Sequence, residues 1–289
     1  MSYDSTRPLI VMHVPKSAGV SIQRALVAAL TPDRAVSGFD ATLFGDFRNF
    51  ASFAEEIRNL IYLDKAGLPR EADFVSGHFS LSTLSPVFPM GQFLTVLREP
   101  ITRLLSLWLF WRALADAYVQ LWGPEWGRRL RLSRGPLAEF LCAREIACQT
   151  DNQVVRMLLA PHPLIPQDDF IDQRHDAALV REARLRLKRF DFIDIVENRN
   201  LEANLAKWIG RPFALGKDNV TGEIPKPLRS PISDEATPEA AALLDARSRL
   251  DLNLWLEVAG GCVPGTDGRS FRRQTIAASL PRYARMMTV

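Results

Sequence analysis

The chain has 289 residues, of which 47% are apolar, 24% charged and 9% aromatic, values that exclude a disordered or fibrous architecture. The 36 Lys and Arg against 33 Asp and Glu leave a net charge of +3, which is too small for a general nucleic-acid binder. We therefore expect no nucleic-acid partner, and we expect any anion site to be local.

Four short runs have the length and composition of β-strands: residues 8–14, 72–76, 92–97 and 191–196. The first run is almost continuously apolar, which is typical of a strand buried on both faces of a parallel sheet. Polar residues and a turn signal follow each of the next two runs at once, so both are predicted to end at a loop.

Helices are predicted between and after these runs. Apolar residues recur at helical spacing from Ile22 until Pro32 stops the pattern, and Pro100 is well placed in the first turn of another helix. Two more helices are predicted over residues 201–209 and 238–258. Strands that alternate with helices predict an α/β fold of three layers, with a central and mostly parallel sheet flanked by helices.

The chain carries no linker-like stretch, so we expect a single domain over residues 1–289. Its three cysteines make an odd number without metal-ligand spacing, which predicts neither a disulfide framework nor a metal site: Cys142, Cys148 and Cys262. The first apolar run is too short for a secretory segment or a membrane span. We expect a soluble, cytoplasmic protein.

A turn of small residues with a lysine and two hydroxyls opens the helix after the first strand: Lys16, Ser17, Ala18, Gly19, Val20 and Ser21. Backbone N–H groups at a helix start favour an anion, and glycine lets phosphate oxygens approach closely. The turn therefore predicts a phosphate cradle. It is not a Walker A loop, because Lys16 precedes the only glycine. The alternative is a solvated lysine after a buried strand.

Arg98 follows the third predicted strand, and Ser106 lies about two helical turns further on. The planar guanidinium donates paired hydrogen bonds to phosphate oxygens, so Arg98 and Ser106 are predicted to hold one phosphate. The alternative is that Arg98 pairs with Glu99 or another carboxylate and that Ser106 bonds backward along its helix.

His78 follows the second predicted strand and is the best general base that the sequence offers at neutral pH. His13 is predicted to be a core residue inside the first strand. Since the carboxyl ends of parallel strands meet at one edge of a sheet, we expect Lys16, His78 and Arg98 to converge there.

Two motifs together resemble the sulfotransferases related to heparan sulfate 2-O-sulfotransferase. Residues 13–21 (HVPKSAGVS) resemble the H-I-P-K-T-A-G-T-S signature of that family, and residues 98–106 resemble its R-D-P-x-x-R-x-x-S segment. Residues 76–79 resemble the G-H element. Looser matches occur in family order at residues 149–153, 156–158, 192–198 and 219–221.

This resemblance implies a P-loop-like fold that binds 3′-phosphoadenosine 5′-phosphosulfate (PAPS) and transfers its sulfuryl group to a hydroxyl without a metal. The signature turn, with Lys16, Ser17, Gly19 and Ser21, would hold the 5′-phosphosulfate. Arg98 and Ser106 would hold the 3′-phosphate, and His78 would be the base. Val20 and Glu99 replace the threonine and aspartate usual in the family. Two rivals stay open: a small-molecule kinase that uses Mg-ATP, and a catalytically silent nucleotide-binding module.

A segment rich in arginine and tryptophan, residues 122–134, suggests the chemical class of the acceptor. Indole rings stack on sugars and arginines pair with carboxylates or sulfates, so an anionic glycan is one candidate acceptor. On this hypothesis the segment lines the acceptor cleft together with the loop around Lys226 and Arg229. The alternative is a solvated amphipathic helix.

Overall fold

The computed structural model of the chain describes residues 2–45, 50–216 and 221–288. Within them, six strands form one sheet in the order β3-β2-β4-β1-β5-β6, and every neighbouring pair is parallel. The strands are β1 (Leu9–Met12), β2 (Ala35–Asp40), β3 (Ile61–Tyr62), β4 (Phe74–His78), β5 (Gln92–Leu97) and β6 (Phe192–Ile195).

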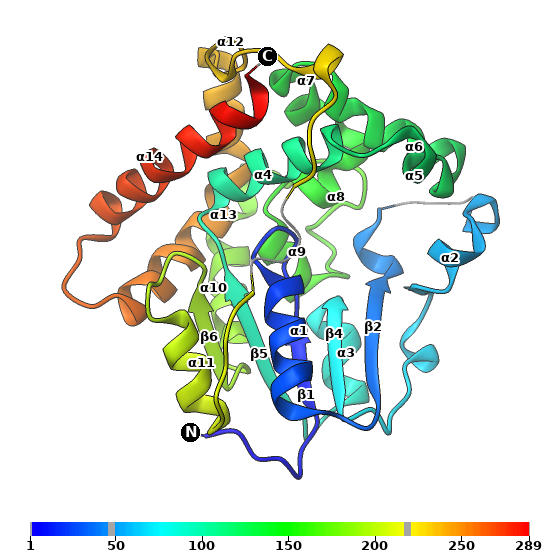
Figure 1. Cartoon of the computed structure of the whole chain (residues 1–289), viewed down its shortest axis with the longest axis vertical. Coiled ribbons are helices and arrows are strands. Elements are labelled where there is room, and N and C mark those ends of the chain that lie inside the picture. Colours follow the sequence, from blue (N-terminus) through cyan, green and yellow to red (C-terminus); the bar gives the residue numbers. More distant parts are fainter. Residues whose placement is uncertain (1, 46–49, 217–220, 289) are drawn as a thin grey trace.

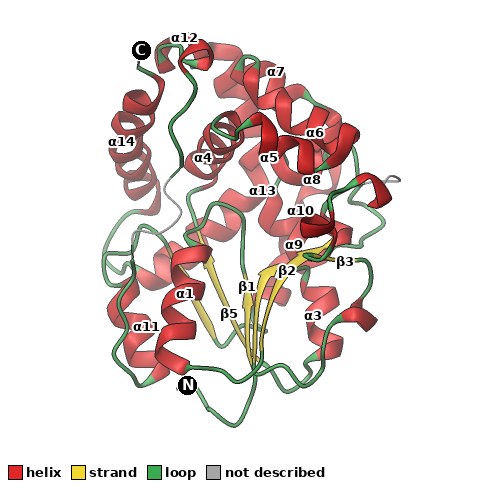
Figure 2. Ribbon diagram, turned by 45° about the vertical axis from the view of Figure 1, so that its right-hand side comes forward, coloured by secondary structure: helices red, strands yellow, loops and turns green. Residues whose placement is uncertain are grey.

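Helices cover both faces of this sheet (Figures 1 and 2). One face carries α1 (Gly19–Leu30) and α11 (Leu201–Ile209), and the other carries α3 (Leu81–Val87), α9 (Gln153–Leu159), α10 (Asp176–Leu187) and α13 (Pro238–Cys262). Alternating side chains of β1 supply both cores, because Leu9 and Val11 pack against α1 and α11, whereas Ile10 and Met12 pack on the opposite side. The predicted three-layer α/β fold with a parallel sheet is confirmed.

A further group of helices lies beyond the carboxyl ends of the strands (Figure 1). It comprises α4 (Pro100–Arg112), α5 (Asp116–Leu121), α6 (Gly123–Arg131), α7 (Leu137–Cys142), α8 (Ala147–Thr150), α12 (Ile232–Glu235) and α14 (Gly268–Met287), while α2 (Glu55–Arg58) follows β2. These helices share a separate core rich in aromatic residues, including Trp108 and Phe140. Residues of α4, α5, α6 and α14 line a cavity at this edge of the sheet.

All four predicted strands and the four predicted helices are present, with ends shifted by a few residues. The sequence patterns missed the strands β2 and β3, and they predicted none of the helices outside those four, α14 among them. Most of β2 is exposed or half-buried and contains Gly38, and β3 has two residues, so neither produces an apolar run. Cys142, Cys148 and Cys262 are free thiols. No helix in the described ranges is long and apolar enough to cross a membrane.

Candidate functional site

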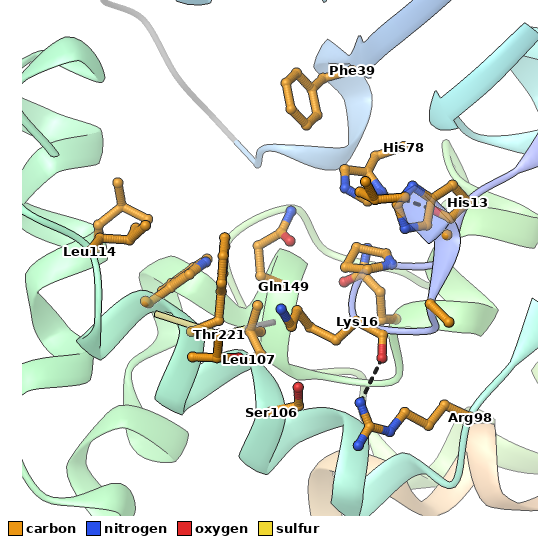
Figure 3. Close-up of a pocket in the computed structure, with 18 of the residues that line it drawn as sticks. His13, Lys16, Phe39, His78, Arg98, Ser106, Leu107, Leu114, Gln149 and Thr221 are labelled. Atoms are coloured by element: carbon orange, nitrogen blue, oxygen red, sulfur yellow. Dashed lines mark hydrogen bonds between the residues drawn. The ribbon is translucent and has the colours of Figure 1, made fainter. Parts of the chain in front are cut away.

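Three neighbouring strands deliver the predicted site residues to one place. In the sheet β1 lies between β4 and β5, with Met12 level with Gly77 and Val11 level with Leu94, so the three carboxyl ends are side by side. His78 ends β4, Lys16 lies in the turn after β1, and Arg98 follows β5. All three line one cavity of about 900 Å³ (Figure 3). The predicted convergence is therefore present.

The turn between β1 and α1 has an unusual backbone. Lys16 and Ala18 adopt left-handed conformations with φ of 66° and 58°, and α1 begins at Gly19 with no acidic residue in its first turn. A Cβ on Gly19 would lie 1.8 Å from Cδ2 of His13, so only glycine allows the imidazole to approach so closely. The predicted cradle residues Lys16, Ala18, Gly19, Val20 and Ser21 line the cavity.

Ser17 differs from its neighbours in this turn. It is not part of the cavity wall, and its buried hydroxyl has no hydrogen-bond partner among the residues that the structure describes. An unpaired buried hydroxyl carries a desolvation cost of about 1–3 kcal/mol. A ligand that reached into the turn would relieve that cost.

Three cations meet in the cavity wall: Lys16, Arg98 and Arg282 from α14. Nζ of Lys16 lies 3.8 Å from the centroid of the Phe110 ring. Burial, followed by the positive charges of Arg98 and Arg282, lowers the pKa of Lys16 to about 8. Among the described residues no carboxylate pairs with any of the three, and no Asp or Glu lines the cavity. The cluster repels itself until an anion binds.

Arg98 is held by the protein rather than by a carboxylate. Its Nη1 donates to the backbone oxygen of Lys16 at 2.9 Å (Figure 3), and Nη2 donates to the hydroxyl of Tyr283. The alternative pairing of Arg98 with Glu99 is wrong, because Glu99 is buried and pairs with Arg272 at 3.1 Å. Ser106 lies in the cavity wall near Arg98, as predicted. Arg98 thus ties the turn after β1 to α14.

His78 has a defined tautomer. Its Nδ1 lies 2.7 Å from the backbone oxygen of His13, and since a carbonyl only accepts, Nδ1 carries the proton. The lone pair is therefore on Nε2, for which no hydrogen-bond partner occurs in the described parts of the chain. Burial, followed by the charge of Lys16, lowers the pKa of His78 to about 4 despite the bond to His13. The imidazole is neutral at pH 7.

His13 is buried, as the sequence predicted, but it lies one residue beyond the strand rather than inside it. The strand β1 ends at Met12, because the chain turns there to reach α1. The ring of His13 packs 4.4 Å from that of His78 and lines the cavity. Burial, helped by the neighbouring His78 and Lys16, lowers the pKa of His13 well below its usual value.

The expected acceptor segment lines the cavity with its apolar residues only. Trp122, Trp126 and Leu130 belong to the wall, and no arginine of this segment does. The arginines form ion pairs elsewhere: Arg128 with Glu145, Arg129 with Glu125 and Asp168, and Arg131 and Arg134 with Asp116. Lys226 and Arg229 do not line the cavity either. The segment therefore reaches this cavity through its apolar side chains and not through its cations, and its role in acceptor binding stays a prediction.

Sequence reasoning missed several residues of the wall. Phe39 comes from β2, which gave no strand signal, and Arg282 comes from α14, which lies beyond the recognised pattern. Gln153 lines the cavity, and its side-chain oxygen and nitrogen are both buried with no hydrogen-bond partner in the described ranges. Gln153 belongs to one of the looser family matches, residues 149–153, and that match was the signal in the sequence that could have predicted its place in the site.

Other loosely matching segments have varied positions. Thr221 lines the cavity, whereas residues 219–220 lie outside the described residues. Asp151 and Arg156 form a buried ion pair of 2.9 Å away from the cavity wall. Comparison with protein-family models and with curated proteins finds no match for this chain.

Proposed function

We propose that this protein is a sulfotransferase that moves the sulfuryl group of PAPS to a hydroxyl. One observation carries the proposal: a neutral imidazole and a cation cluster with no carboxylate partner in the described chain line the same cavity at the ends of three adjacent strands. Ligands of open α/β sheets bind at this edge. The likeness of residues 13–21 and 98–106 to the sulfotransferase motifs supports the same activity.

The residues present suit a nucleotide with two separate phosphate groups. Lys16, the buried hydroxyl of Ser17 and the N–H groups at the start of α1 would hold the 5′-phosphosulfate. Arg98, Ser106 and Arg282 would hold the 3′-phosphate. Arg98 has donors left for this role, since two of its five N–H groups are used within the protein.

The bound PAPS would supply the transferred group: the acceptor oxygen bonds to sulfur while the bridging S–O bond breaks, and adenosine 3′,5′-bisphosphate leaves. The acceptor proton would pass to Nε2 of His78, which holds the free lone pair. The charge of Lys16 disfavours the imidazolium in the free protein. Negative charge bound beside Lys16 would offset that repulsion and raise the pKa of His78.

Lys16 would act on the leaving group. Negative charge grows on the oxygen that bridges to the 5′-phosphate, and an ammonium in a partly water-excluded site stabilises it strongly. Arg98 fixes the turn that carries this ammonium through its bond to the backbone of Lys16. Positioning and electrostatics supply most of the acceleration in the related phosphoryl transfers.

Calorimetry with adenosine 3′,5′-bisphosphate tests the proposal. Binding without Mg²⁺, together with an increased thermal midpoint, is expected, and transfer of labelled sulfate from PAPS to a hydroxyl should follow. Preference for Mg-ATP would favour a kinase instead. Nucleotide binding with no transfer to any hydroxyl would leave a silent module and contradict the proposal.

A further inference from the structure

We infer that the acceptor is an uncharged hydroxyl compound with an aromatic or branched aliphatic body, and not an anionic glycan. The inference rests on the proposed function, because it concerns the molecule that would meet His78 in the same cavity. It follows from how aromatic residues and charges are distributed along the wall.

A continuous cluster of aromatic rings runs from the imidazole of His78 away from the turn after β1. Phe39 lies 5.3 Å from His78, and Phe44 lies 5.6 Å from Phe39, between ring centroids. Trp122 then lies 5.8 Å from Phe44, and Trp126 lies 5.2 Å from Phe44. All five side chains line the cavity. A hydroxyl next to the base would therefore have an aromatic surface beside the rest of its molecule.

Leucines complete this half of the cavity. The wall includes Leu43, Leu107, Leu114 and Leu130, and Figure 3 shows Leu114 far from Lys16 and Arg98. Tyr118 is 41% exposed and also lines the cavity, so it lies where the cavity meets solvent. An apolar body bound here would bury its own surface against apolar side chains, and the removal of that surface from water favours binding.

Charge is confined to the other end. The cations in the described wall are Lys16, Arg98 and Arg282, which are close enough for the two arginines to lower the pKa of Lys16. The arginines of α6 pair with carboxylates outside the cavity, so none of them is placed to meet an acidic sugar. A carboxylate or sulfate brought among the aromatic rings would lose hydration without gaining a partner.

Two probes separate the alternatives: 2-naphthol for an apolar alcohol and a heparosan oligosaccharide for an anionic glycan. We expect transfer of labelled sulfate from PAPS to 2-naphthol with a kcat/KM at least tenfold above that for the oligosaccharide. Calorimetric titration with 2-naphthol in the absence of nucleotide should also detect binding. A higher kcat/KM for the oligosaccharide would overturn the inference and leave the sulfotransferase proposal standing.

Substitutions in the cavity wall test where 2-naphthol binds. Leu114→Asp places a charge in the apolar half, and it should raise the KM for 2-naphthol at least tenfold while the Kd for adenosine 3′,5′-bisphosphate stays within twofold. Ala115→Asp adds the same charge one residue away, at an exposed position outside the wall, and should leave both constants unchanged. Arg128→Ala should also leave the KM unchanged.

Two results would contradict the inference. One is an equal affinity of wild type and Leu114→Asp for 2-naphthol, and the other is a raised acceptor KM in Arg128→Ala. Failure of adenosine 3′,5′-bisphosphate to bind would instead overturn the proposed function. In that case the titration with 2-naphthol, which needs no nucleotide, still decides whether the aromatic wall takes an apolar ligand.

Discussion

Nδ1 of His78 donates a hydrogen bond of 2.7 Å to the backbone oxygen of His13. The bond joins the end of β4 to the turn after the neighbouring β1. It fixes both the rotation of the imidazole and its tautomer, so Nε2 is the nitrogen that holds the lone pair. A base that is already oriented loses less entropy when it meets its substrate.

Replacing this base should stop turnover and spare nucleotide binding. We expect His78→Gln to lower kcat by at least about 10²-fold, the lower range for general base catalysis. The Kd for adenosine 3′,5′-bisphosphate, measured by calorimetry, should change by less than about threefold. His175→Gln, in a residue that does not line the cavity, is the control. Near-full turnover in His78→Gln would remove the base assignment.

The pH dependence of the reaction should reflect the lowered pKa of His78. Because that pKa is about 4 in the free protein, the acid limb of kcat/KM should lie near pH 4, far below the ordinary imidazole value of 6.5. The acid limb of kcat should lie at higher pH, since bound negative charge raises the pKa in the complex. Circular dichroism at each pH separates titration from unfolding. Acid limbs of kcat and kcat/KM that coincide near 6.5 would contradict this assignment.

Nucleotide affinity should fall as the pH rises through the pKa of Lys16. That pKa is lowered to about 8 in the free protein, so the ammonium that attracts an anion is lost above it. An anion raises the pKa, and binding above pH 8 must therefore take up a proton. Calorimetry at pH 7 and 9.5 in buffers of different ionisation enthalpy measures both effects. In Lys16→Ala this pH dependence should vanish, and kcat should fall at least about 10²-fold.

Arg282 should contribute to nucleotide binding although it is 184 positions from Arg98 in the chain (282 − 98). We expect Arg282→Ala to weaken binding of adenosine 3′,5′-bisphosphate about tenfold or more, as loss of a charge-assisted hydrogen bond predicts. Arg285→Ala is a matched control, because Arg285 is exposed on the same helix and lies outside the cavity wall. Equal effects of the two substitutions on the Kd would mean that Arg282 acts only through the overall positive charge of the protein and does not contact the nucleotide.

Gly19→Ala should destabilise the fold, because its Cβ would clash with the imidazole of His13. Overpacking of this kind costs about 1–3 kcal/mol, which lowers the thermal midpoint by several degrees. Gly260→Ala is the control, since nothing lies within 4 Å of a Cβ there and alanine is the better helix former. An unchanged midpoint in Gly19→Ala would mean that the His13 ring moves aside freely.

The sequence by itself determined the layers of this protein and the edge at which its polar residues gather. Short, mostly apolar runs such as Leu9–Met12 and Gln92–Leu97 indicate strands buried on both faces. Which residue follows each strand can be read from the sequence without tertiary information. For the same reason Lys16, His78 and Arg98 were expected together. The anion-binding turn around Gly19 could also be predicted from the sequence, because its composition depends on residues that are neighbours in the chain.

Only the tertiary structure decided which partners those residues have. Arg98 binds Tyr283 rather than Glu99, and Arg282 joins Lys16, because α14 packs across α4 near the end of β5. The arginines of α6 are paired by distant carboxylates such as Glu145, which left the tryptophans to line the cavity. Periodicity in a sequence reports which face of an element is buried. It carries no information on which residue, far along the chain, will lie opposite that face.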